Sequence, residues 1–259
     1  MFQGNVICFG DATHRHPPIN GLGSNTCISD AFNIAWKLAY VLKGQASSAI
    51  LDTITPDRKP VAVGVVRRAN EGMVAHRDLW QVIGLVKEEQ DRFFEVRAQA
   101  SADGKSLRQN LDAAIEKITN EVQALGIQMN QSYVNSALTK IENVDIHPTF
   151  ADPNPIKHLL VSTFPGYHLP HIWLCEPGKK ERLSTLDLAG HGVFTLLTGI
   201  GGDKWKVTAA ELTHRSKLIL NAFSIGYRQD YADMYRDWPK IREVDEDGAI
   251  LVRPDHFIA

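Results

Sequence analysis

The chain has 259 residues, of which 44% are hydrophobic and 22% are charged, and its formal net charge is −2. This composition is typical of a soluble globular protein with one large or two ordinary domains. A nearly neutral chain gives no support for binding to nucleic acid or to an anionic membrane surface. No apolar run approaches the roughly 18 residues that span a bilayer, and no signal peptide is recognisable. Three cysteines without a CxxC spacing favour reduced thiols, so we expect a cytoplasmic protein. From its charge and hydropathy we expect neither a membrane nor a nucleic-acid partner.

The first expected element is a strand at residues 4–9, because the run Val6-Ile7-Cys8-Phe9 is short and apolar, which predicts a buried strand. The strand ends at Gly10-Asp11. In α/β proteins the carboxyl end of a strand is the usual place for a ligand, and Asp11 could accept hydrogen bonds there. Gly-Asp pairs are also common in turns that bind nothing, so the pair taken alone favours an ordinary turn.

The loop at residues 10–24 strengthens the case for a ligand site. Pro17-Pro18 stiffens the backbone, whereas Gly21 and Gly23 permit close approach of another molecule. We expect Asn25-Thr26 to cap the helix that follows. The start of that helix would direct backbone N–H groups toward an anionic or electron-rich group.

The next hundred residues are predicted to be helical. A helix at 25–43 is expected to bury an apolar face with helical spacing, made of Ile28, Ala31, Phe32, Ala35, Leu38, Ala39 and Leu42. A longer helix is expected at about 57–85, with Pro60 in its first turn. Residues 86–125 are charged and mostly helical in pattern, with a break at Asp103-Gly104.

The pattern changes after residue 125. Prolines at 148, 153 and 155 indicate a linker, and the short β-type runs beyond it indicate a small α/β domain. Strands are expected at 158–164, 172–174, 183–188, 193–198 and 218–225, a helix at 203–217, and a hairpin over 241–258 that turns at Glu246-Asp247-Gly248.

These motifs resemble one enzyme family. The run GDATHRHPPINGLGSNTCISDAFNIAWKLA at residues 10–39 resembles the second flavin-contact motif of FAD-dependent aromatic hydroxylases, most closely the phenol and chlorophenol monooxygenase branch. Residues 51–60 resemble that family's LLDTY-x-x-ER-x-P motif. Residues 165–174 and 251–259 resemble the entry to its C-terminal domain and its terminal strand pair.

The resemblance implies an α/β architecture with three parts. Residues 1–125 would be the C-terminal part of an FAD domain like that of p-hydroxybenzoate hydroxylase. Residues 126–157 would be a linker, and residues 158–259 a thioredoxin-like α/β domain. The family's N-terminal Rossmann strand, Gly-x-Gly-x-x-Gly turn and helix, which hold the FAD diphosphate, are not found in this sequence.

The resemblance also implies the chemistry. NADPH would reduce FAD, a flavin C4a-hydroperoxide would hydroxylate a phenolic substrate, and the complete enzyme would be a homodimer. Asp11 would bind the ribityl chain of FAD, and Pro18 would border the reactive edge of the flavin. The pyrimidine side of the flavin would be wrapped by Gly21, Leu22, Gly23, Ser24 and Asn25.

Two alternatives remain beside this interpretation. The chain could be a non-catalytic binding or dimerisation fragment of a truncated gene, in which case the DNA upstream of Met1 would not encode a Gly-x-Gly-x-x-Gly turn.

We expect no catalytic residue in this chain and no hydroxylase activity from the chain alone. His14-x-His16 could suggest a metal pair, but no third ligand lies near it in the sequence, so no metal is expected.

Overall fold

A computed structural model describes residues 2–4, 6–141, 148, 150 and 154–259. The helices are α1 (Asp11–His14), α2 (Gly23–Leu42), the 3₁₀ helix η1 (Ser48–Thr53), α3 (Ile54–Ile83), α4 (Lys87–Arg97), α5 (Ala102–Val122), α6 (Leu125–Met129), α7 (Thr185–Leu188), α8 (Asp203–Arg215) and α9 (Trp238–Ile241). The strands are β1 (Phe2–Gln3), β2 (Val6–Ile7), β3 (Trp173–Cys175), β4 (Arg182–Ser184), β5 (Phe194–Thr198), β6 (Leu220–Ser224), β7 (Ala232–Asp233) and β8 (Ala249–Val252). This mixture of helices and sheets confirms the α/β class.

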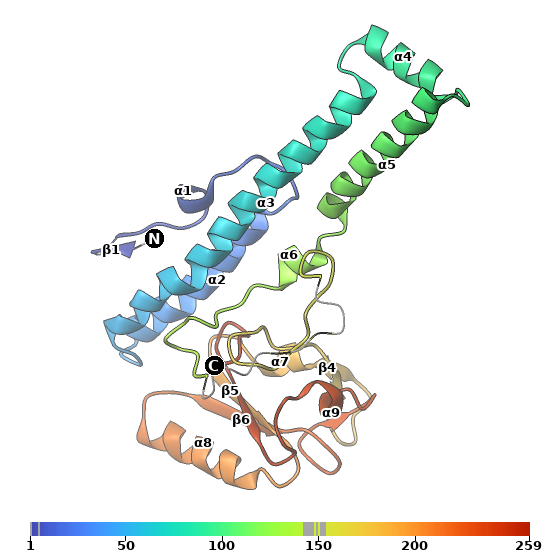
Figure 1. Cartoon of the computed structure of the whole chain (residues 1–259). Coiled ribbons are helices and arrows are strands. Elements are labelled where there is room, and N and C mark those ends of the chain that lie inside the picture. Colours follow the sequence, from blue (N-terminus) through green and yellow to red (C-terminus); the bar gives the residue numbers. More distant parts are fainter. Residues whose placement is uncertain (1, 5, 142–147, 149, 151–153) are drawn as a thin grey trace.

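The long helices form an arm above the C-terminal sheets. Helices α2 and α3 pack on each other, and α3 continues upward to pack along α5, with α4 closing the tip (Figure 1). The β5, β6 and α8 elements lie at the opposite end of the molecule (Figure 1). Residues 10–22, which carry the predicted ligand loop, run beside α3 near the middle of the arm.

The expected buried strand at 4–9 is wrong in both length and burial. β2 covers two residues and pairs only with β1 among the described residues, in an antiparallel hairpin. Val6 has 64% of its surface exposed and Phe9 has 44%. An apolar run becomes a buried strand only where other elements cover it, and Val6 and Phe9 of this run stay exposed.

The expected buried face of α2 is also wrong. Ile28, Phe32 and Leu42 are exposed, whereas a polar stripe on the opposite face is buried. The members of that stripe are Thr26, Asp30, Asn33 and Lys37. Their partners lie on other elements, so apolar spacing alone could not identify which face is covered.

Two further expectations for the helices need correction. The chain does not break at Asp103-Gly104, because Ser101 caps α5 and accepts a hydrogen bond from the Gly104 N–H at 3.2 Å. Helix α6 begins at Leu125 and covers the first residues of the expected linker 126–157, whose other described residues form no helix or strand. The prolines of that linker lie at 148 and 155, within the described residues, and at 153, outside them.

The C-terminal part contains two three-stranded sheets. Strands β5 and β6 are parallel and joined through α8, while β8 adds to the other side of β5 in antiparallel register. The second sheet has the order β4-β3-β7. The hairpin expected over 241–258 is therefore wrong, because β8 pairs with β5 and not with the residues before the turn. Residues 158–164 form no strand, and the strand expected at 183–188 gives way to α7 after Ser184.

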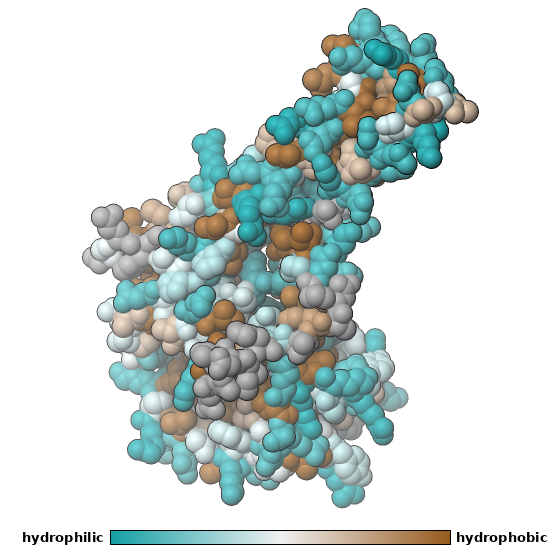
Figure 2. Space-filling view, viewed as in Figure 1, coloured by the Kyte–Doolittle hydropathy of each residue, from teal (hydrophilic) through white to brown (hydrophobic). Residues whose placement is uncertain are grey.

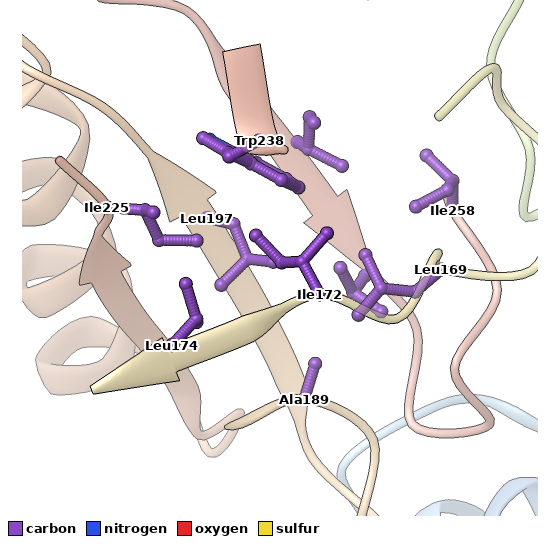
Figure 3. Packing of buried hydrophobic residues seen from close by; sticks show 10 residues of the cluster. Leu169, Ile172, Leu174, Ala189, Leu197, Ile225, Trp238 and Ile258 are labelled. Carbon is purple, nitrogen blue, oxygen red and sulfur yellow. The ribbon is translucent and has the colours of Figure 1, made fainter. Parts of the chain in front are cut away.

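A hydrophobic core holds these sheets together. Leu174 of β3, Leu197 of β5 and Val252 of β8 are fully buried, and Trp238 of α9 and Ile225 pack with them (Figure 3). Burial of a large apolar side chain typically contributes about 1.5–3 kcal/mol relative to leaving it exposed. The core therefore fixes the position of β8, and with it the residues that follow β8.

On the face shown in Figure 2 most side chains are hydrophilic, but apolar side chains gather near the tip of the helical arm. Leu85 and Val86 between α3 and α4, and Phe94 of α4, are each more than half exposed. None of the helices in the described part of the chain combines the length and the apolar character needed to cross a bilayer.

Candidate functional site

The structure places Asp11 in a helical turn and not at the tip of a strand. The carbonyl of Gly10 accepts hydrogen bonds from the N–H of Thr13 at 2.8 Å and of His14 at 3.1 Å, which turns the chain into α1 directly after the glycine. Gly10 has φ = 63°, a conformation that glycine adopts without strain. Asp11 is exposed, and its Oδ1 lies 3.9 Å from Sγ of Cys27 on α2. Asp11 and the first turns of α2 are therefore neighbours.

The N-terminus of α2 is left without a side-chain cap. The helix begins at Gly23, and Leu22 in the cap position offers no polar side chain. Asn25 and Thr26 were expected to cap the helix, but their side chains donate back to the carbonyls of Gly21 at 2.9 Å and Leu22 at 2.7 Å. Because the first N–H groups of a helix have no acceptor within it, the amides at positions 23–25 can donate to a bound group.

The other predicted contact residues border this helix start. Pro18 is exposed and sits at the centre of a tight turn in which the Ile19 N–H donates to the Pro17 carbonyl at 2.7 Å. Gly21 is exposed with φ = 60° and has open space where a side chain would lie. Of the seven predicted residues, Asp11, Pro18, Gly21, Ser24 and Asn25 are exposed, Gly23 is half-buried and Leu22 is buried.

Helices α3 and α5 hold this loop in place. The Asn20 N–H donates to Oε1 of Glu121 at 3.2 Å, and Oε2 of Glu121 lies 2.5 Å from Nε2 of His76. A Cβ atom added to Gly72 would lie 2.6 Å from Cγ2 of Ile19 and 2.7 Å from Oδ1 of Asn20. A side chain at residue 72 would therefore push the Ile19 and Asn20 side chains away from α3. Sequence reasoning missed these anchors, which lie 50 to 100 positions downstream of the loop.

Two residues of the loop, His16 and Asn20, have buried polar atoms without a hydrogen-bond partner among the described residues. Nδ1 of His16 lies 2.8 Å from the Pro17 carbonyl, which only accepts, so Nδ1 carries a proton. Nε2 of His16 is buried without a hydrogen-bond partner among the described residues. The Oδ1 and Nδ2 atoms of Asn20 are also buried without such a partner. Buried polar atoms are normally hydrogen-bonded. The exposed carboxylate, the uncapped helix and these atoms together suit a polar cofactor.

A buried ionic network underlies the loop. Asp30 of α2 accepts from the Gly10 N–H at 2.9 Å and from Nε of Arg58 at 2.6 Å, and its Oδ2 lies 3.0 Å from Nε2 of His14. The Arg58 guanidinium also donates to the Tyr133 hydroxyl at 2.8 Å. The side chains of His14, Asp30 and Arg58 have no exposed surface. His14, a candidate metal ligand by its sequence pattern, instead fixes the entry to α1.

The network extends to the C-terminal residues. Oδ2 of Asp57 accepts from Nζ of Lys37 at 2.7 Å and from Nη2 of Arg253 at 2.8 Å. Arg253 also donates to both carboxylate oxygens of Asp255, at 3.0 and 2.9 Å. Asn33 connects the two carboxylates, with Nδ2 at 3.1 Å from Asp57 and from Asp255. This cluster joins α2, α3 and the segment after β8.

Burial and neighbouring charges shift several pKa values in this network. Burial lowers the pKa of Lys37 from 10.5 to about 8, although Asp57 opposes the shift. Burial alone would raise the pKa of Asp57, but the charges of Arg253 and Lys37 outweigh it and lower that pKa below its usual value. Burial raises the pKa of Tyr133 to about 12, so its hydroxyl stays protonated beside Arg58.

Comparison with known proteins gives two family matches. Residues 1–69 match the family described as FAD binding domain, and residues 162–259 match the family described as aromatic-ring hydroxylase, C-terminal. The first match contains the loop and the start of α2, and the second contains the C-terminal sheets and Arg253.

Similar proteins cover the whole chain. A phenol 2-monooxygenase from Pseudomonas sp. (strain EST1001) is 42% identical over 99% of this chain and 42% of its own length. A 2,4-dichlorophenol 6-monooxygenase from Delftia acidovorans is 40% identical over 100% of this chain and 44% of its own length. The crystal structure of the flavin-dependent monooxygenase PieE in complex with FAD and substrate matches with a TM-score of 0.91 and 36% identity, covering 100% of this chain and 44% of that one.

The chain thus spans less than half the length of the relatives that it matches. The two family matches and the identity of about 40% along the chain confirm the resemblance that the motifs at residues 10–39 and 251–259 indicated. From end to end, the chain is homologous to proteins named phenol 2-monooxygenase and 2,4-dichlorophenol 6-monooxygenase.

Proposed function

We propose that this chain supplies the flavin-facing loop and the C-terminal domain of an FAD-dependent monooxygenase that hydroxylates phenolic compounds. The observation that carries the proposal is the uncapped start of α2 beside the exposed carboxylate of Asp11, within the segment that matches an FAD binding domain. A helix N-terminus attracts negative charge, and a carboxylate accepts hydrogen bonds from hydroxyl groups.

Each loop residue has a role in this proposal. Asp11 accepts a hydrogen bond from a ribityl hydroxyl of FAD. The amides at positions 23–25 donate toward the electron-rich pyrimidine side of the flavin. Pro18, at the centre of its tight turn, presents a rigid backbone to the edge of the ring where oxygen is activated. The Asp30 and Glu121 contacts keep these groups in fixed positions before the cofactor binds.

When bound, FAD would be reduced by NADPH and would then activate oxygen for transfer to a phenol. This chain's part is to orient the flavin and to exclude water from one side of it. The relatives named phenol 2-monooxygenase and 2,4-dichlorophenol 6-monooxygenase support a phenolic substrate. The chain contains no Gly-x-Gly-x-x-Gly turn, so we expect the isolated chain to bind FAD more weakly than the micromolar range and to lack hydroxylase activity.

A titration of FAD into ¹⁵N-labelled chain tests this proposal. The amide signals of Gly23, Ser24 and Asn25 should shift, and Asp11→Ala should weaken binding by roughly ten- to a hundredfold, the value of a charge-assisted hydrogen bond. Asp52→Ala is the matched control, because Asp52 is also an exposed aspartate but lies outside the loop. Equal FAD affinities for the two variants, or unshifted amides at saturation, would refute the assignment.

We also propose the domain division given by the family resemblance, with an FAD-domain segment at 1–125, a linker at 126–157 and a thioredoxin-like domain at 158–259. The parallel β5-α8-β6 unit with antiparallel β8 supports the last part. A homodimer is proposed for the complete enzyme. The non-catalytic alternative would be favoured if the chain sedimented as a dimer and showed no FAD-dependent amide shift.

A further inference from the structure

A cavity of about 420 Å³ lies between α3, the start of α6 and the residues that follow α6. In Figure 1, α6 lies between the helical arm and the C-terminal sheets. The cavity is distinct from the flavin loop, since none of the seven predicted flavin contacts lines it. Its volume falls within the usual range of small-molecule sites, about 300–1,000 Å³.

A buried arginine on α3 lines this cavity. Arg68 is only 7% exposed, and its one hydrogen bond among the described residues joins Nη1 to Oε2 of Glu71 at 3.2 Å. Nε is buried with no partner in the described part of the chain. A guanidinium has five N–H donors and stays charged, so a buried one with a single weak partner carries a large desolvation cost that an anion would offset.

The charges at the cavity leave it positive. Two guanidinium groups, Arg67 and Arg68, and one carboxylate, Glu71, line it, which leaves one positive charge. Glu71 is half exposed and is shared between both arginines, at 3.9 and 3.2 Å. The exposed Arg67–Glu71 pair contributes little, about 0–1 kcal/mol. The contact between Arg68 and Glu71 uses only Nη1 of the guanidinium, so the other N–H groups of Arg68 remain available to a ligand.

Gln131 also lines this cavity. Gln131 uses Oε1 to accept from Nη1 of Arg58 at 2.7 Å, which leaves its Nε2 donors without a partner among the described residues. The remaining walls are largely apolar and include Val61, Val65 and Ile156. Arginine and an amide can each donate to one oxygen of a carboxylate, while apolar walls suit a hydrocarbon body.

We infer that this cavity binds a small organic carboxylate with an apolar body, with Arg68 as its charged anchor and Gln131 as its second donor. The inference goes beyond the proposed function, because neither Arg68 nor the cavity requires flavin. Binding is therefore expected from the chain without FAD.

Benzoate is the probe, and benzamide is its uncharged control with the same ring. Isothermal titration of the FAD-free chain should give saturable benzoate binding and at least tenfold weaker benzamide binding, the minimum expected from a charge-assisted contact. Arg68→Gln should weaken benzoate binding at least tenfold. Arg77→Gln removes a guanidinium on the same helix that does not line the cavity and whose side chain is 65% exposed, so this variant should leave the affinity within twofold.

A second variant tests the cavity without touching the charge. Gly64 lines the cavity, and no atom lies within 4 Å of the position that a Cβ would take there, so Gly64→Met should fill the space without a clash. It should also weaken benzoate binding at least tenfold, and circular dichroism will confirm that each variant is folded. Absence of saturable benzoate binding, equal affinity for benzamide, or unchanged affinity in Gly64→Met would overturn the inference. A failed FAD titration would not affect it.

Discussion

Arg253 and Asp57 are 196 positions apart in the sequence, yet Nη2 of Arg253 donates to Oδ2 of Asp57 at 2.8 Å with both side chains fully buried. Arg253 follows β8, and Asp57 lies in the first turn of α3. The guanidinium also lies over the rings of Tyr133 and Trp36, at 4.9 and 5.7 Å from their centroids. One side chain thus attaches the C-terminal sheets to the helices that carry the flavin loop.

Removal of Arg253 should destabilise the whole chain. Arg253→Met leaves Asp57 and Asp255 buried with fewer cationic partners, and breaking a buried pair typically costs about 3–5 kcal/mol. Urea unfolding followed by circular dichroism measures the change. Lys87→Met is the control, because Lys87 and its partner Asp91 are mostly exposed, and its effect should stay within about 0.5 kcal/mol. Similar unfolding midpoints for both variants would contradict the role given to Arg253.

Lys37 should give the chain an unusual dependence on alkaline pH. Its pKa is about 8 in the folded state and near 10.5 when unfolded, so between these values the unfolded chain binds more protons and stability rises with pH. The full effect is about 3 kcal/mol, from about 1.4 kcal/mol per pKa unit.

Comparison with Lys37→Met isolates this contribution from other titrating groups. The unfolding free energy of the wild type, relative to that of the variant, should increase from about pH 8 to about pH 10.5 and should be constant below about pH 7, as the two pKa values of Lys37 require. A difference that falls over the alkaline range would show that Lys37 keeps its charge in the folded protein.

Gly72 should control the order of the flavin loop from a distance. Gly72→Ala places a methyl group against Ile19 and Asn20, and overpacking of this kind typically costs about 1–3 kcal/mol. Amides at residues 19–22 should then exchange hydrogen faster, as mass spectrometry can measure. Gly64→Ala on the same helix meets no atom within 4 Å and should instead stabilise the chain by up to about 1 kcal/mol. Unchanged exchange in Gly72→Ala would mean that the loop does not depend on this contact.

Local signals in the sequence predicted much of the fold. The helices at 23–42 and 54–83, the β5-α8-β6 unit and the family motif at residues 10–39 all follow from patterns within about thirty residues. The buried face of α2 was missed, since Asp30 and Lys37 are buried only because Arg58 and Asp57 meet them. A charged side chain is buried only where an oppositely charged partner meets it, and a local hydrophobicity pattern does not show which distant residue that partner is.

The same reason limits prediction of the site. The sequence indicated Asp11 and the start of α2, but not the anchors at positions 72, 76 and 121 that hold the loop. Glu121 lies in a charged run whose pattern is typical of a solvated helix face. The hairpin expected at residues 241–258 was wrong because the partner of β8 is β5, some fifty residues earlier. These contacts join segments that lie far apart in the sequence.

The placement of Arg253 and Asp255 has a consequence for folding during synthesis. Asp57 and Asn33 emerge from the ribosome about two hundred residues before the groups that complete their cluster. Until then, α2 and α3 can pack only incompletely, and the charged side chains that are buried in the folded protein stay hydrated. Domains generally fold in order as they emerge, but here α2 and α3 must wait for Arg253 and Asp255, so their incomplete cluster is exposed to chaperones and proteases until those residues have been made.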